Sequence, residues 1–218
     1  RFPIACYLSS ATTMKNILKF AVLGLTAIAS LGTVNAAGTL GVRSVSANWV
    51  THDWQRSDVK SAYGGGIDVS VPVHAKVDIL GHYRFYRWEQ FKWDNTMTDA
   101  NIGFRYHEAF EKTNDKLKLF VGGDLGNHWL TGKGYGRKVE SKSWTWFVNT
   151  GLEYEVINDL SIMVKASYGK APEISEEGVT YYTASANYWI TKNIGLNASF
   201  TINEESDRLT ALGASYRF

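Results

Sequence analysis

The stretch RLTALGASYRF, residues 208–218, decides the fold. In an extended strand the side chains alternate between two faces. Leu212, Ala214, Tyr216 and Phe218 share one face, which is therefore apolar and ends in two aromatic rings, while the other face is small and mixed. A barrel in a membrane needs such a last strand, because it must pair with the first strand to leave no open edge in lipid. The alternative is the last strand of a soluble sandwich, and the rest of the chain favours the barrel.

The N-terminal part of the chain predicts export. Residues 1–13 precede the first methionine and look extraneous, whereas residues 14–36 have the layout of a cleaved secretory signal peptide. Lys15 and Lys19 supply its positive start, an apolar run follows, and small residues around Ala36 form the cleavage site. The alternative is an N-terminal membrane helix, but the apolar run is short for a span and no stop-transfer charges follow it.

Residues 37–218 are long enough for one domain, and their composition limits its chemistry. Cys6 is the only cysteine, so the exported part has neither disulfides nor thiolate metal sites. The first 36 residues carry three cations (Arg1, Lys15 and Lys19) and no acid, so the formal charge of +2 becomes −1 after cleavage. Nothing in this balance indicates a nucleic-acid partner.

Ten alternating runs of about ten residues follow, the length that crosses the hydrocarbon layer at a barrel tilt. The run 38–50 is the least regular, because its apolar residues change parity, which suggests a bulge. Eight strands is the main alternative to ten. Short and longer connections alternate, as expected of a membrane barrel. We expect the connections at one end to be 72–75, 107–115, 158–159 and 191–193, and those at the other end to be 52–58, 87–97, 127–142, 170–177 and 203–207.

Aromatic residues gather at both ends of the apolar rows. Tyr and Trp prefer the boundary between lipid and water, so two such rings are expected to mark the membrane interfaces. One ring comprises Tyr106, Tyr154, Tyr188 and Phe218, and the other Phe85, Trp144, Tyr168 and Phe200.

The run from residue 77, the turn segments 154–160 and 188–196, and the terminal Tyr216-Arg217-Phe218 resemble small bacterial outer-membrane β-barrels of the opacity and OmpA-like type. This resemblance implies an all-β fold, a single closed antiparallel up-and-down transmembrane β-barrel in the bacterial outer membrane. It also implies contact with outer-membrane lipid and lipopolysaccharide, and recognition of the C-terminal strand by the barrel assembly machinery. It identifies the architecture and leaves the activity open.

The opposite face of the runs carries charges of both signs, which we expect to point into the lumen. Enclosed charges must be paired or hydrated, because an uncompensated one costs several kcal/mol. The pattern therefore predicts a salt-bridged, wet core that blocks free passage, and a narrow channel for small solutes is the alternative. The predicted network comprises Asp68, Asp78, His82, Arg84, Asp99, Arg105, Lys118, Asp124, Glu153 and Lys165.

Catalytic signals are weak. An enzyme at the outer rim would need a histidine beside a carboxylate or a serine. His52 with Asp53, and His128 with Asp124, are the candidate pairs, but no enzyme motif accompanies them. The glycine-rich segment 132–138 lacks the ending of a phosphate-binding loop. We therefore expect no enzymatic activity, no cofactor and no metal site.

The expected outer loops hold aromatic and basic residues. These side chains either anchor the interface and remain solvated, or form a surface that binds an extracellular ligand, lipopolysaccharide phosphates or acidic glycans. The candidates are Trp88, Trp93, Trp129, Lys133, Arg137 and Lys138. The sequence thus favours a structural or adhesin-like surface role over a channel, and a channel over an enzyme.

Overall fold

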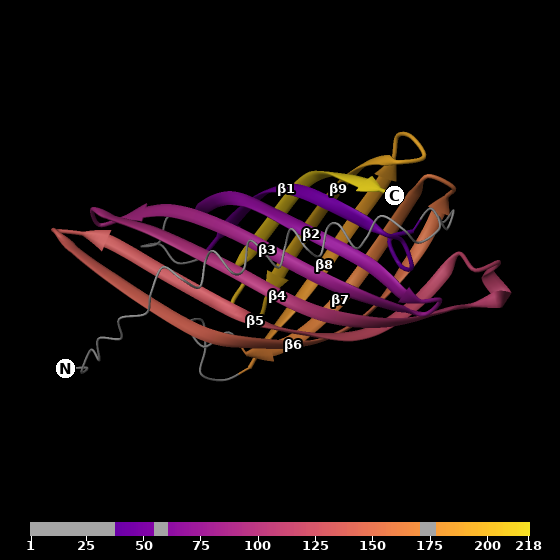
Figure 1. Cartoon of the computed structure of the whole chain (residues 1–218), viewed down its shortest axis with the longest axis horizontal. Helices are drawn as coiled ribbons and strands as arrows, with labels where there is room; N and C mark the ends of the chain where they lie inside the picture. Colours follow the sequence, from indigo (N-terminus) through magenta and orange to yellow (C-terminus); the bar gives the residue numbers. More distant parts are fainter. Residues whose placement is uncertain (1–37, 55–60, 171–177) are drawn as a thin grey trace. The chain divides into compact units, whose positions relative to one another are not determined.

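The computed structural model describes residues 38–54, 61–170 and 178–218, so the predictions for residues 1–37 lie outside its described part. The described residues form one closed barrel of ten antiparallel strands, each hydrogen-bonded to its sequence neighbours (Figure 1). The predicted up-and-down barrel of ten strands is confirmed. The strands are β1 (Ser44–Asp53), β2 (Ala62–His74), β3 (Val77–Gln90), β4 (Trp93–Ala109), β5 (Leu117–Gly134), β6 (Arg137–Ile157), β7 (Leu160–Lys170), β8 (Val179–Trp189), β9 (Ile194–Asn203) and β10 (Arg208–Arg217).

Closure occurs between the first and the last strand. β1 and β10 pair without interruption from Ser44 opposite Arg217 to Asp53 opposite Arg208. The ladder continues past β10, because the amide of Phe218 donates to the carbonyl of Arg43 at 3.2 Å. The segment 208–218 therefore takes the position that its alternation predicts.

The barrel has two different ends. The proximal end holds the start of β1, Phe218 and the connections β2–β3, β4–β5, β6–β7 and β8–β9. A short 3-10 helix, η2 (Glu111–Thr113), lies in the β4–β5 connection. The distal end holds the remaining five connections. Within the described residues, no helix has both the length and the apolar character that crossing a bilayer requires.

Strands β3 to β6 extend beyond the others at the distal end. β5 and β6 have 18 and 21 residues, whereas β7 to β10 have 10 or 11 each. The β3–β4 and β5–β6 hairpins reach past the β9–β10 connection in Figure 1. The predicted loops 87–97 and 127–142 are therefore wrong, because each is a continuing hairpin closed by two residues, 91–92 and 135–136.

The first run also differs from its prediction. β1 starts at Ser44 and its register against β2 and β10 is continuous, so the expected bulge is absent from this described strand. Register shifts occur instead near Pro72 in β2 and Glu155 in β6. The parity change within residues 38–50 has another cause: residues 38–43 precede the strand and contact inward-facing side chains of the barrel.

Candidate functional site

Apolar side chains cover the outside of the barrel. Ile102, Leu125 and Leu212 are 57–65% exposed although they lie in the middle of strands. In water such a continuous apolar surface would be unstable, whereas in lipid it is the expected face of a transmembrane barrel. All eight predicted interface aromatics point outward. The set at the distal end, which contains Phe85, Trp144, Tyr168 and Phe200, has five further exposed aromatic residues that sequence reasoning missed: Trp49, Tyr63, Tyr83, Trp146 and Tyr182.

The predicted charge network lies on the inner face. Its centre is Asp68, which accepts hydrogen bonds from His82 Nδ1 at 2.7 Å and Asn48 Nδ2 at 2.6 Å. Arg84 lies 3.9 Å from the same carboxylate. Sequence reasoning expected charged partners and missed the amide donors, although Asn48 shares the parity of the inward residues of β1. The lumen is therefore held by mixed polar contacts as well as ion pairs.

Two further inward carboxylates have partners on neighbouring strands. Asp99 bonds His128 Nδ1, and Asp124 accepts from Asn149. The candidate pair of His128 with Asp124 is therefore not formed, since His128 contacts Asp99 instead. Ser143 lies directly opposite His128 on β6, but its hydroxyl has no hydrogen-bond partner among the described residues. The described rim thus holds a His–carboxylate pair without a hydrogen-bonded serine triad.

Residues 38–41 form a plug in the proximal mouth of the barrel. The amide of Thr39 donates to Glu153 Oε1 at 2.7 Å, and that of Leu40 donates to Glu153 Oε2 at 3.1 Å. The flanking amides of Gly38 and Gly41 donate to Glu155 and Asp78, each at 3.1 Å. Four successive backbone amides therefore satisfy inward carboxylates of β6 and β3.

The plug is tightly enclosed. Leu40 is 1% exposed, and Glu153 and Asp78 are 1% and 0% exposed. A Cβ at Gly38 would lie 2.6 Å from Glu153 Oε2, so this position admits only glycine without a shift. Gly41 has a φ of +76°, a conformation that other residues rarely adopt. The two glycines fit the peptide to its carboxylates.

Arg105 completes the proximal mouth. Its guanidinium donates to Asp78 Oδ2 at 2.9 Å and stacks near Phe120, 5.7 Å from the ring centre. His107 approaches the same carboxylate at 3.6 Å, and Lys118 lies 3.6 Å from Glu155. His107 belongs to β4, not to the predicted turn 107–115.

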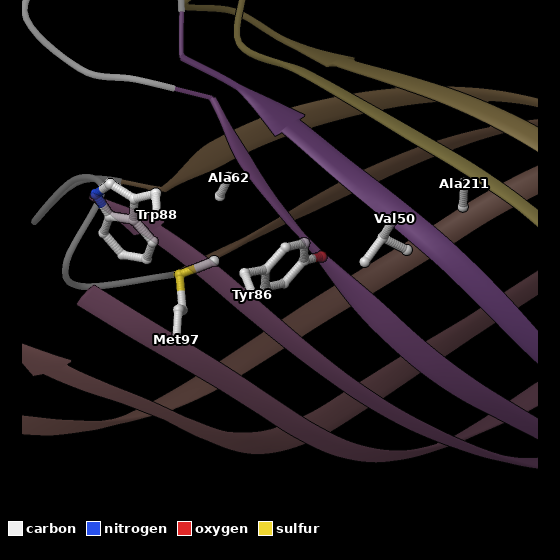
Figure 2. Close-up of a cluster of buried hydrophobic side chains, with 6 residues drawn as sticks. All are labelled: Val50, Ala62, Tyr86, Trp88, Met97 and Ala211. Atoms are coloured by element: carbon white, nitrogen blue, oxygen red, sulfur yellow. The ribbon is translucent and has the colours of Figure 1, made fainter. Parts of the chain in front are cut away.

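An apolar cluster fills part of the distal lumen. Tyr86, Trp88 and Met97 form its centre, and Val50, Ala62 and Ala211 complete it from neighbouring strands (Figure 2). Trp54 packs on Trp88, with ring centres 4.9 Å apart, and stacks on His52 at 4.4 Å. Trp88 was expected in an exposed loop, and this is wrong: it is 9% exposed and has the inward parity of Asp78, His82 and Arg84.

Two cavities of about 220 and 230 Å³ remain between plug and cluster. Both are lined by His82, Arg84, Asp124 and Lys165, so this belt of charges lies between them. No carboxylate of the described residues lies within 4.0 Å of the Lys165 ammonium group. The lumen is therefore space divided by a charged belt.

The other surface candidates lie on the extended hairpins. Trp93 begins β4, Trp129 lies on the outer face of β5 under Lys142 at 5.3 Å, and Lys133 precedes the β5–β6 turn. Arg137 and Lys138 follow that turn and are exposed. Phe91 and Tyr135, which were not among the predicted binding residues, occupy the two turns and are each 70% exposed.

Comparison of the sequence with protein-family models and with curated proteins gives no match. Several solved structures are similar to this chain. The attachment invasion locus protein of Yersinia pestis is 13% identical, with a TM-score of 0.45 over 83% of this chain and 100% of its own. For Neisserial surface protein A the identity is 13% and the TM-score 0.43, over 80% and 95%. For the NanC porin they are 10% and 0.47, over 80% and 100%. At these identities the likeness concerns the fold alone.

The membrane assignment rests on the barrel itself. Its apolar rows and aromatic rings face outward, and its charges face inward. A soluble barrel that holds a ligand would show the reverse arrangement. The chain is therefore a ten-stranded up-and-down β-barrel of the outer-membrane type.

Proposed function

We propose that this barrel resides in the bacterial outer membrane and acts as a surface-interaction protein with a closed lumen. The observation that carries the proposal is the extended distal sheet. Residues 137–145 of β6 precede Trp146, the first residue that pairs with β7. Trp144 belongs to the aromatic ring at the membrane interface, and the seven residues before it, 137–143, span about 24 Å of strand, so the β5–β6 hairpin projects beyond the apolar band.

The turn residues support a contact role. Two-residue hairpin turns with positive φ favour Asn-Gly. Here Phe91, Lys92 and Tyr135 have φ values of 49°, 65° and 50°. A bulky residue in this region costs about 1–3 kcal/mol. The backbone preference of a two-residue turn does not account for these residue types, and their exposed rings fit the contact role proposed here.

The proposal is tested by replacing the turns without disturbing the barrel. Phe91→Asn with Lys92→Gly, combined with Tyr135→Asn, gives both turns favoured residues. Cells producing wild type are expected to adhere to surfaces coated with matrix proteins or polysaccharides. The variant is expected to be at least as stable but to lose most of this adherence. Equal adherence of both proteins at equal surface amounts would contradict the proposal.

A narrow channel is the second candidate, and the two lumen cavities favour it. Planar-bilayer recordings separate the candidates. Wild type is expected to show no discrete openings, since the plug and the apolar cluster obstruct the two ends. Reproducible single-channel steps would overturn the closed lumen and favour the channel.

A further inference from the structure

An aromatic cluster lies at the tip of the extended distal sheet. Trp93 packs over the backbone of β5, where a Cβ at Gly134 would lie 2.7 Å from Trp93 Cδ2 and one at Gly132 would lie 3.3 Å from Cε3. Tyr135 meets the same indole edge-on, with ring centres 6.3 Å apart and planes at 64°. Because the two glycines leave room for it, the indole ring lies on bare backbone.

The two hairpin tips are joined at this cluster. The hydroxyl of Tyr135 donates to the carbonyl of Phe91 at 3.3 Å, so the β5–β6 turn contacts the β3–β4 turn. The aromatic groups therefore belong to one corner of the sheet, and their relative positions are set before any ligand binds. We name Trp93, Tyr135 and Phe91 the tip platform.

Cations lie on both faces of the sheet at the tip platform. The register places Arg137 opposite Gly134, on the face where Trp93 packs. It places Lys133 and Lys138 on the outer face with Trp129. Asp94 lies opposite Lys133 on the neighbouring strand. Residues 133–142 contain four cations and one anion, although the whole chain carries a formal charge of only +2. Lys133 and Lys138 are directly opposite each other in the register, an arrangement that destabilises a hairpin. Lys138 also pairs with Glu140, the one anion of this segment. An anionic partner would offset the repulsion between the two lysines.

We propose that the tip platform and its cations bind a negatively charged polysaccharide, which rests on the surface-interaction function proposed above. The C–H face of a sugar ring stacks on an aromatic ring, and carboxylate or sulfate groups pair with Arg137 on the same face and, around the end of the hairpin, with Lys133 and Lys138. Neither lumen cavity includes a residue of this tip. An open surface without an enclosed pocket suits an extended polymer better than a small molecule.

The test measures binding of the whole barrel in nanodiscs to alginate, dextran sulfate and neutral dextran. Wild type is expected to bind both polyanions, more weakly as salt rises, and not dextran. Gly134→Ala, which displaces the Trp93 ring without removing it, is expected to weaken alginate binding at least tenfold. Lys133→Gln with Arg137→Gln is expected to weaken binding of both polyanions at least tenfold.

Two matched controls exclude general effects. Gly65→Ala adds the same carbon where its nearest contact is 3.6 Å away, and Lys76→Gln removes an exposed cation at the proximal end. Both are expected to bind within twofold of wild type. Circular dichroism and unfolding establish that each variant is folded, and Tyr135→Asn, which suits the turn, replaces Gly134→Ala if that variant misfolds.

Three results would overturn the inference: unchanged binding by the folded variants, equal affinity for neutral dextran, or binding only to vesicles containing phosphorylated glycolipid. The last result would show that the cations bind phosphate groups of the membrane surface and not a polysaccharide. If the turn variant loses adherence while no polyanion binds, this inference fails and the proposed function stands. If adherence is also unchanged, both fail.

Discussion

Glu153 and Thr39 are 114 positions apart in the sequence and are joined by two hydrogen bonds. Glu153 Oε1 accepts from the Thr39 amide at 2.7 Å and from the Thr39 hydroxyl at 3.0 Å. Ser161 donates to the same oxygen at 3.1 Å. A carboxylate that is 1% exposed is thus satisfied mainly by a peptide outside the strands. The plug and the barrel wall stabilise each other.

Glu153→Gln tests this dependence. The variant keeps the size of the side chain but turns one acceptor into a donor that faces amide donors. Hydrogen bonds to charged groups contribute about 1.5–3 kcal/mol, so we expect a loss of about 2 kcal/mol in unfolding free energy. Amide exchange at Thr39 and Leu40 should accelerate. The exposed Glu140→Gln is the control, and unchanged exchange in Glu153→Gln would show that the plug is held by other contacts.

Trp88→Ala tests whether this side chain is buried in the lumen or exposed in a loop. Truncation of a buried tryptophan costs about 3–5 kcal/mol, which denaturant unfolding in detergent would detect. Phe91→Ala, only three residues away but 70% exposed, is expected to change stability by less than about 0.5 kcal/mol. Equal effects of the two substitutions would contradict the apolar cluster.

Leu125→Arg tests the outer face. Leu125 is 63% exposed in the middle of β5, where arginine would face lipid. At the midplane this costs about 2–4 kcal/mol, falling to about 0–1 near the interfaces. Thr131→Arg lies on the same face of the same strand, beyond the aromatic ring, and serves as the control. If the two variants have equal unfolding free energies after refolding into lipid vesicles, the assigned lipid-facing band is misplaced.

The Lys76–Glu108 ion pair predicts a pH effect at the proximal end, outside the lipid band. Hydrogen bonds from Lys76 and then from Tyr106 lower the pKa of Glu108, and the bond to Glu108 raises the pKa of Lys76. A lowered carboxyl pKa gives stability that is present above the unfolded value, about 4.3, and is lost as pH falls through the folded value. A raised ammonium pKa gives stability that is present below about 10.4 and is lost as pH rises through the folded value.

The pair should therefore stabilise the barrel between these limits. We expect the difference in unfolding midpoint between wild type and Glu108→Gln to be small, since both groups are exposed, and largest near neutral pH. It should shrink at about pH 3 and at about pH 11. A difference that persists unchanged at low pH would assign the effect of the substitution to packing.

The lipid-facing rows were predictable because the bilayer demands them. Every second residue of a spanning strand must be apolar, so the alternation alone identifies Leu212, Tyr216 and Phe218 as lipid-facing residues. The extended hairpins were not predictable in this way. A strand beyond the bilayer has water on both faces and needs no alternation of apolar and polar residues. The glycines and charges around Lys133 therefore predicted a loop.

The sequence pattern predicted which residues face the lumen but not which groups they hydrogen-bond. Asp78 and Glu153 were placed inward by their neighbours, whereas their amide donors carry no side-chain signal. Gly38 and Gly41 are the only traces of the plug in the sequence, and two glycines do not specify a docking site. Trp88 was identifiable, since it continues the inward row of β3, but its aromatic neighbours favoured a loop.

The pairing of β1 with β10 sets a condition on biogenesis. Ser44 contacts Arg217, so the ring cannot be completed until nearly every residue between them has left the ribosome. During that interval the apolar outer face is not covered by lipid, and the edges of β1 and β10 are unpaired and can pair with other chains. We therefore expect insertion of this polypeptide into a membrane to depend on a chaperone that keeps it unfolded, and the rate of insertion should follow the supply of that chaperone.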